Sequence, residues 1–280
     1  MDDVTLCSLA SGSSGNCTYL ATANTRLLID AGISTRRIRT HLKELGTDVD
    51  ELDGVCVTHE HSDHVQALPL LNGKHGVPLY GNAGTIKSLA HKSKFADLRW
   101  KVFASGQPFE IGDFHFQPFS IPHDAFDPVG FVVTAHGHRI GFATDMGLAT
   151  SLIRHQLKGC HVLILETNHD RILLDESDRP WSLKQRIAGR QGHLSNEEAA
   201  ALLKEIAGPE LQRVYLAHMS QDCNQEELAE SCIRMTLKEM KREDVVVEMT
   251  YPKQPSAVWR TRKVEETVRT VIQDELVLRD

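Results

Sequence analysis

Short apolar runs and amphipathic stretches alternate along the chain, separated by residues that favour turns. Runs of aliphatic and β-branched residues predict strands at residues 5–9, 19–21, 26–29 and 55–57. Hairpins are expected over residues 107–122 and 130–145, turning at Gly112–Asp113 and at His136–Gly137. Strands that alternate with helices, without an obvious linker, predict one α/β domain in which helices cover the sheets.

Two helices have clear end signals. Residues 34–45 carry apolar side chains at helical spacing, and Gly46 follows as a stop. Residues 195–207 begin with a capping box formed by Ser195 and Glu198. The apolar stripe of this second helix consists of Ala199, Leu202, Leu203 and Ile206.

The C-terminal quarter carries weaker signals. Asn224 with Glu227 predicts the start of a third helix. Its apolar positions would be Leu228, Cys232 and Met235. Residues 245–249 then predict a strand, followed by a charged helix. Residues 244–280 carry no interpretable motif, and either completing the sandwich or contacting a partner would explain them.

The composition of the 280 residues, with 41% hydrophobic and 25% charged side chains, is that of a globular protein. No apolar run could span a bilayer, and residues 1–4 lack signal-peptide features, which predicts a cytoplasmic protein without membrane contact. The net charge of −7 argues against general polyanion binding, so nucleic acid would need a local basic patch. The six cysteines are scattered without a C-x-x-C pair, which predicts reduced thiols.

Chemically capable side chains follow six apolar runs, at the points where the corresponding strands would end. These residues are Asp30, His59, His123, Asp145, Glu166 and His218. Ligands of α/β sheets gather beyond the carboxyl ends of strands, so the six residues are expected to converge on one site.

The densest cluster among the 15 histidines is the run T-H-E-H-S-D-H at residues 58–64. Histidines at positions i and i+2 can reach one metal, and an aspartate and a histidine directly after them can turn to a second. A solvated histidine-rich loop is the alternative. The position directly after a buried strand favours the metal site.

The run at residues 59–64 resembles the signature of the metallo-β-lactamase-fold hydrolases, whose other motifs occur in the family's order. The matching residues are Asp30, His123, Asp145 and His218. The resemblance spans about residues 4–220 and implies an αββα sandwich, two mixed sheets flanked by helices, with a two-metal site at one edge. His115, His136 and His138 compete with His123 for the third motif; His123 is preferred because it follows a strand run and precedes Asp124, a candidate partner.

The resemblance also implies a ligand set. His59, His61 and His123 would hold one metal; Asp63, His64 and His218 would hold the other; and Asp145 would bridge them. Asp30 is expected to support a ligand by hydrogen bonding rather than to bind a metal. Zinc is the first candidate because five imidazoles are present, and the two carboxylates leave manganese and iron open. Two divalent ions would leave the site with net positive charge, which suits an anionic substrate.

The spacing of the motifs favours a compact phosphodiesterase or nuclease. Asp145 stands where β-lactamases often have cysteine, and the residues after His64 lack the Gly-Gly of glyoxalase II. The interval between His123 and Asp145 is too short for the long arm of many tRNase Z enzymes. The interval between Asp145 and His218 is too short for the β-CASP domain of RNase J relatives. We therefore expect a single domain over residues 1–280.

Two further motifs indicate phosphodiester chemistry. Glu166-Thr167-Asn168 resembles a tRNase Z motif, and residues 192–195 resemble the family's loop that places a histidine beside the scissile phosphate. Glu166 and His193 are expected to protonate the leaving oxygen, and Asp63 to orient or deprotonate the attacking water. Ser195 begins a helix whose free N–H groups favour an anion. The alternative for His193 is a helix-entry residue packed against the surface.

Residues 179–196 contain no acidic side chain and form a candidate substrate-binding patch. The patch comprises Arg179, Trp181, Lys184, Arg186 and Arg190. Its cations could contact phosphates, and a base could stack on Trp181. A solvated helix face with a buried tryptophan explains the same pattern equally well.

Residues 8–17, 122–125 and 192–196 closely resemble the bacterial YycJ/WalJ family. This resemblance implies a metal-dependent exonuclease acting on DNA from 5′ ends, with a link to DNA repair and to repair proteins as partners. Nothing in the composition distinguishes DNA from RNA, and the oligomeric state is not indicated. The alternatives are a small-molecule metallohydrolase (cyclic phosphodiester, thioester or lactone), an RNA-processing nuclease, and a binding protein without turnover. The complete ligand set argues against the last of these.

Overall fold

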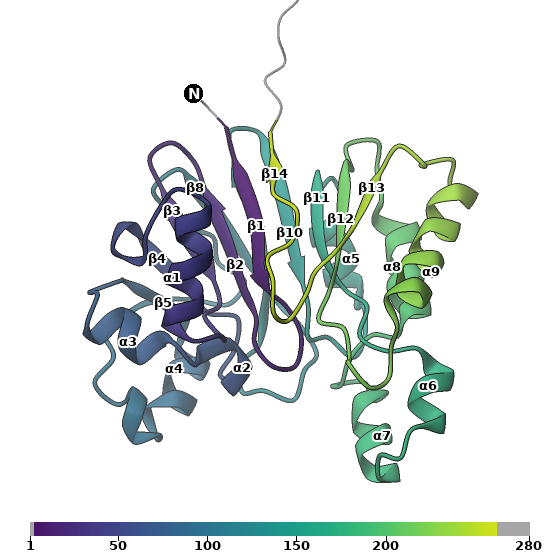
Figure 1. Ribbon diagram of the computed structural model, residues 1–280, viewed down its shortest axis with the longest axis horizontal. Coiled ribbons are helices and arrows are strands. Elements are labelled where there is room, and N and C mark those ends of the chain that lie inside the picture. Colours follow the sequence, from purple (N-terminus) through teal and green to yellow (C-terminus); the bar gives the residue numbers. More distant parts are fainter. Residues whose placement is uncertain (1–2, 262–280) are drawn as a thin grey trace, which may run out of the picture.

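Two seven-stranded β-sheets pack face to face, with helices on both outer faces, in the computed structural model, which describes residues 3–261 (Figure 1). The first sheet has the order β14-β1-β2-β3-β4-β5-β6, and the second has the order β13-β12-β11-β10-β9-β8-β7. The expected αββα sandwich of two mixed sheets is confirmed.

The predicted strands lie close to their expected positions, and the strands at residues 79–82, 100–103 and 259–260 were not predicted. The first sheet contains β1 (Thr5–Ala10), β2 (Cys17–Ala21), β3 (Arg26–Ile29), β4 (Gly54–Cys56), β5 (Leu79–Asn82), β6 (Trp100–Phe103) and β14 (Trp259–Arg260). The second contains β7 (Phe109–Ile111), β8 (Phe114–Ser120), β9 (Val129–Ala135), β10 (His138–Ala143), β11 (Val162–Glu166), β12 (Arg213–Ala217) and β13 (Val246–Met249). Both predicted hairpins are present, with left-handed φ angles of 54° at Gly112 and 48° at His136 in their turns.

The helices divide between the two outer faces, apart from one pair near the lower edge in Figure 1. Beside the first sheet lie α1 (Thr35–Glu44), α2 (Ser62–Val65), α3 (Leu68–Gly73) and α4 (Ala83–Ala90), with short 3₁₀ turns at Val49–Glu51 and Ser93–Phe95. Beside the second lie α5 (Ser151–Leu157), α8 (Asn196–Ile206) and α9 (Glu226–Glu239). The pair α6 (Arg171–Glu176) and α7 (Trp181–Ile187) projects beyond the sheets.

Alternation along the strands sorts the core into three layers. Leu27 and Ile29 of β3 belong to the layer between the sheets, whereas Leu28 packs on the outer side with α1. In β11, Val162 and Ile164 likewise lie between the sheets. Strands buried on both faces read as continuous apolar runs, which is why the sequence showed them so clearly.

The start and the buried face of α9 differ from the prediction. The helix begins at Glu226 with Gln225 as N-cap, because the Asn224 amide is bonded to Thr167 O and to the Asn196 side chain. Its buried face consists of Ala229, Ile233 and Leu237. Leu228 and Met235 are instead exposed, and Cys232 is only partly buried. The predicted positions were wrong by one or two residues because both faces of α9 carry apolar side chains.

The C-terminal part of the described chain completes both sheets. β13 pairs with β12, and β14 pairs with β1, which joins chain ends that are far apart in sequence. Residues 250–261 therefore form a connection and a strand rather than the expected charged helix. The rest of that predicted helix lies outside the described residues.

The parallel strands β3–β6 and β10–β13 end at the same edge of the sandwich, where the chain turns sharply. Asp30, Asp145 and His218 have φ values of 59°, 58° and 56° at three of these turns. Such left-handed conformations cost little only for glycine; Asp, Asn and His tolerate them better than other residues. Their concentration at one edge is typical of a functional site.

Candidate metal centre

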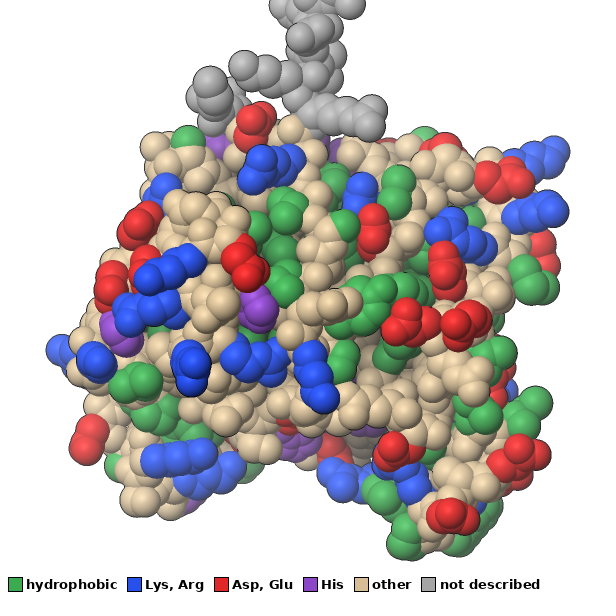
Figure 2. Space-filling model, viewed as in Figure 1, with side chains coloured by type: hydrophobic (Ala, Val, Ile, Leu, Met, Phe, Trp, Pro, Cys, Tyr) green, Lys and Arg blue, Asp and Glu red, His purple; other side chains and the backbone are tan. Residues whose placement is uncertain are grey.

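The predicted metal-binding residues converge at the lower edge of the sandwich in Figure 1. Figure 2 shows histidine and acidic side chains inside a hollow at this edge, between the helices that project from the two sides of the sandwich. Four overlapping groups of possible ligands lie here, and within each group the ligand atoms are within 4.8 Å of one another. His115, His136 and His138 belong to none of these groups.

The first half of the centre consists of three imidazoles. His59, His61 and His123 form one of the four groups. His123 Nε2 lies 3.3 Å from His61 Nδ1, and the rings of His59 and His123 meet edge to face with centroids 5.0 Å apart. His59 is completely buried and its Nε2 has no hydrogen-bond partner. Neutral imidazoles around an unsatisfied nitrogen are a donor set that suits zinc and other first-row divalent ions.

The second half combines imidazoles with carboxylates. Asp63 Oδ2 lies 3.4 Å from His64 Nε2 and 3.7 Å from His218 Nε2. Asp145 lies between the halves: its Oδ2 is 3.6 Å from His64 Nε2, and its Oδ1 is 3.9 Å from His123 Nε2. Asp145 Oδ2 and His218 Nε2 are both buried without a partner. The arrangement fits a second divalent ion with Asp145 shared between the two.

Each buried histidine of the centre has one ring nitrogen engaged away from the metal site. The Nδ1 atom of His59 lies 3.0 Å from Thr58 Oγ1, and that of His64 lies 2.8 Å from Asp30 Oδ2. The Nδ1 atom of His123 lies 3.2 Å from Gly192 O, and that of His218 lies 3.2 Å from Glu166 Oε1. Partners of this kind fix the tautomer and direct the other nitrogen to a metal. All four Nε2 atoms are thereby left for metal ligation, and the residues present fit two divalent ions.

The two halves differ in electrostatics. Burial lowers the pKa of His59, and the neighbouring His64 and His123 add to this effect. Burial also disfavours the charged form of His218, but Asp145, Asp63 and Glu166 outweigh it and raise the pKa of His218 to about 10. For Asp63, burial raises the pKa, while His64 and His218 bring it well below its usual range. The carboxylates on the half with Asp63 therefore stabilise positive charge there, which favours a bound cation.

Close backbone packing holds the histidine-rich loop against β3. Asp63 O accepts from Asn16 N at 2.7 Å, and His64 O accepts from Ala31 N at 2.8 Å. A Cβ atom on Gly32 would collide with the carbonyl of Asp63, so only glycine fits there. The glycine two residues after Asp30 thus allows the loop to approach the aspartate that orients His64.

Glu166 and His193 lie beside the second half of the centre, next to His218. The Glu166 carboxylate is completely buried; its Oε1 lies 2.7 Å from His193 Nδ1 and 3.2 Å from His218 Nδ1, and its Oε2 accepts from Met146 N at 2.8 Å. Burial raises the pKa of Glu166, but His193 and His218 outweigh it and keep the carboxyl ionised. His193 lines a cavity of about 170 Å³ together with Arg179 and Arg186.

The predicted basic patch is distributed over three cavities around α7. Arg179 and Arg186 line the cavity at His193, Trp181 and Lys184 line another, and Arg190 lines a third together with Arg186. Arg179 pairs with Asp222 at 2.7 Å, and Arg186 with Asp124 at 2.6 Å. Trp181 is 65% exposed, so the alternative of a buried tryptophan is wrong.

Two other predicted residues have clear structural positions. Asp124 Oδ1 lies 3.5 Å from His123 Nε2, so this carboxylate connects Arg186 to the three-histidine half. Ser195 is completely buried, and its hydroxyl accepts from Glu198 N and Arg171 Nε. A direct contact of Ser195 with substrate stays a prediction that this burial disfavours.

Asn16 is a residue at the centre to which the sequence analysis gave no role. Its side-chain nitrogen lies 3.2 Å from Asp63 Oδ2 and 3.1 Å from His64 Nε2. Ser11 Oγ accepts from His218 N, and the Asn168 amide donates to His218 O. Positions in turns and after strands were the only local signal for these residues, because their partners are distant in sequence.

Comparisons with known proteins agree with this fold. A family profile described as a beta-lactamase superfamily domain matches residues 25–219. Exodeoxyribonuclease YycJ of Bacillus anthracis is 33% identical over 254 residues, covering 89% of this chain and 96% of that protein. Exodeoxyribonuclease WalJ of Streptococcus pneumoniae serotype 2 (strain D39 / NCTC 7466) is 34% identical over 224 residues, covering 79% and 83%. The crystal structure of the metallo-beta-lactamase fold protein YhfI from Bacillus subtilis superposes with a TM-score of 0.70 at 16% identity, covering 93% of this chain and 100% of that one.

The αββα sandwich and its edge of histidine and carboxylate ligands define a metal-dependent hydrolase of the metallo-β-lactamase fold. Within that superfamily, the chain belongs to the family of the YycJ and WalJ proteins. Among residues 3–261, no helix has the length and apolar character needed to cross a membrane.

Proposed function

We propose that this protein is a two-metal DNA exonuclease that degrades strands from their 5′ ends and works in DNA repair in the cytoplasm. The observation that carries the proposal is the juxtaposition of the paired metal-ligand groups with the Glu166–His193 pair and an arginine-lined cavity. The names of the YycJ and WalJ relatives support a deoxyribonucleotide polymer as the substrate.

Two divalent ions, bound by the His59–His61–His123 group and the Asp63–His64–His218 group with Asp145 between them, would activate water and neutralise the phosphate. Zinc is the first candidate, because imidazoles predominate. Asp63 is the exposed carboxylate of the set, with a fifth of its side chain accessible, so it can orient the attacking water or accept its proton.

His193 is positioned to assist the leaving oxygen. Because its Nδ1 faces the ionised Glu166, its Nε2 is the nitrogen left for the cavity that His193 lines. In its doubly protonated form the ring donates the Nε2 proton to the departing oxygen, and Glu166 holds the ring in place. Arg179 and Arg186 line the same cavity, and a phosphate would take the place of their present partners Asp222 and Asp124.

The test is degradation of a 5′-phosphorylated linear DNA duplex by metal-loaded protein, beside His61→Ala and the matched control His155→Ala. His155 is exposed on α5, away from the centre. We expect stepwise shortening from the 5′ end in the wild type and the control, and none with His61→Ala. Shortening of RNA alone, or hydrolysis only of small phosphodiesters, thioesters or lactones, would refute the DNA exonuclease and identify the substrate class instead.

A further inference from the structure

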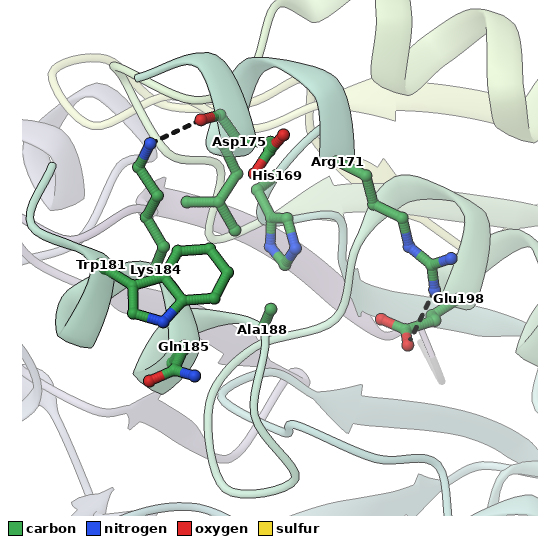
Figure 3. A pocket seen from close by; sticks show the side chains of 9 residues that line it. His169, Arg171, Asp175, Trp181, Lys184, Gln185, Ala188 and Glu198 are labelled. Carbon is green, nitrogen blue, oxygen red and sulfur yellow. Dashed lines mark hydrogen bonds and ion pairs between the residues drawn. The ribbon is translucent and has the colours of Figure 1, made fainter. Parts of the chain in front are cut away.

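A second cavity, of about 550 Å³ (Figure 3), is lined by other residues of α7 than the cavity at His193 is. Trp181, Lys184 and Gln185 project into it from α7. Leu183 and Ile187, on another face of the same helix, line the cavity at His193. The other lining residues lie on α6, directly before it at His169, directly after α7 at Ala188, and in the first turn of α8 at Glu198.

His169 is a buried residue of the lining of this second cavity and has unused hydrogen-bonding capacity. It is only 1% exposed, and its Nδ1 is buried without a partner. Among the described residues, neither ring nitrogen forms a hydrogen bond, although the backbone of His169 is paired with Ser195 and Asn196. Burial lowers the pKa of His169, so at neutral pH the ring offers one donor and one acceptor. A buried polar ring without a partner is costly unless a ligand satisfies it.

Trp181 supplies a flat apolar surface beside this imidazole. The indole is 65% exposed, and Figure 3 shows its ring on the wall of the cavity, near His169. Leu174 adds a buried apolar side chain to the lining. A stacking surface next to a donor and an acceptor matches the faces and the edge of a nucleobase.

The charges at this cavity are already balanced. Lys184 Nζ donates to Asp175 O, and Arg171 pairs with Glu198 at 3.0 Å, as the dashed lines in Figure 3 mark. Asp175 O is a backbone carbonyl, so Lys184 has no ion pair among the described residues, but the lining as a whole carries two cations, Arg171 and Lys184, and two carboxylates, Asp175 and Glu198. A neutral, planar ligand suits such a surface better than a phosphate group does.

We propose that the Trp181–His169 cavity binds a base of the substrate strand, away from the scissile phosphate, an inference that rests on the proposed nuclease function. An α-helix with its side chains is about 10–12 Å across. One strand of B-form DNA advances about 3.4 Å per nucleotide. The base held here is therefore about three nucleotides from the phosphate at His193. The subsite would give the enzyme its grip on polymers, because shorter substrates cannot reach it.

Binding of a phosphorothioate oligodeoxynucleotide, which resists cleavage, to the metal-loaded protein tests this subsite through tryptophan fluorescence. Stacking of a base on Trp181 is expected to quench emission, and Trp181→Ala to weaken binding roughly 5- to 150-fold. Trp181→Phe should restore most of the affinity. Ile172→Ala is the matched control, since Ile172 is 66% exposed on the neighbouring α6 and does not line the cavity. It should bind as the wild type does.

A series of oligonucleotides with one abasic position locates the base. We expect one position, about three nucleotides from the scissile bond, to weaken wild-type binding as much as Trp181→Ala does, and to add no further loss in that variant. Equal binding of the abasic series, or unchanged affinity of Trp181→Ala, would overturn the subsite. So would equally strong quenching by a free mononucleotide, which would make the cavity an effector site. Failure of the wild type to degrade unmodified DNA would instead reject the proposed nuclease function.

Discussion

Replacing Asp30 with asparagine should empty one half of the metal centre and spare the other. The Asp30 carboxylate is 4% exposed and accepts three hydrogen bonds: from Thr58 N, from Thr58 Oγ1 and from His64 Nδ1, each at 2.8 Å. An asparagine of the same shape keeps an acceptor for Thr58 N. Its NH₂ group, however, would face His64 Nδ1 and require that nitrogen to accept. The proton would then move to His64 Nε2, which is the atom needed for the metal.

The structure sets the size of this effect. Two of the three hydrogen bonds can be kept by reversing the role of the Thr58 hydroxyl, and only the charge-assisted bond to His64 is lost. Such a bond contributes about 1.5–3 kcal/mol. Because 1.4 kcal/mol corresponds to a factor of ten, metal affinity at the Asp63–His64–His218 group should fall roughly 10- to 150-fold. The His59–His61–His123 group does not depend on this proton and should retain its affinity.

Metal content per chain after dialysis against a weak chelator measures the outcome. We expect two ions in the wild type, one in Asp30→Asn, and two in the control Asp113→Asn, whose carboxylate accepts from Thr22 and Asn24 in a hairpin far from the centre. Two tightly bound ions in Asp30→Asn would refute the tautomer argument. Loss of both ions with an unchanged circular dichroism spectrum would refute the independence of the two halves.

Three further changes have defined outcomes. His193→Ala should slow DNA hydrolysis by at least about 100-fold. Hydrolysis of an aryl phosphodiester should slow far less, because an acidic phenol leaves without needing a proton. Equal losses of activity on both substrates would contradict the assigned role. Arg190→Glu should weaken DNA binding and lower the salt slope of log Kd by about 1, since Arg190 forms no ion pair within the described residues; an unchanged slope would exclude phosphate contact. Burial raises the pKa of the Cys160 thiol from 9.0 to about 11, so its contribution to stability is complete below pH 9 and is lost as the pH rises through 11. The free energy of unfolding, measured by chemical denaturation, should therefore fall between pH 8 and 11 by about 1–3 kcal/mol less in Cys160→Ala than in the wild type. Equal falls in the two proteins would count against this cause.

Local patterns were reliable where one element determines its own environment. The capping box of Ser195 and Glu198 is present at the start of α8, because both partners lie within one helical turn. The two hairpins turn where glycine or histidine allows a left-handed φ. The pattern failed for α9, whose buried face depends on how the helix packs against β13 and α8 rather than on its own sequence. Asn224 was misread for the same reason, since its amide bonds to residues of other elements.

The amino-acid sequence by itself determined which residues can bind metal and that they follow strands. Motifs such as His59–His64 bring several donors together within a few residues, so no tertiary information is needed to recognise them. Only the tertiary structure decided which nitrogen of each histidine is free, because Asp30, Gly192 and Glu166 reach their partners across the sandwich. It also distributed the basic patch over three cavities around α7 and placed Trp181 in one cavity with His169. Cavities and hydrogen-bond partners arise from segments that are distant along the chain, and their distances are set by the packing of the two sheets.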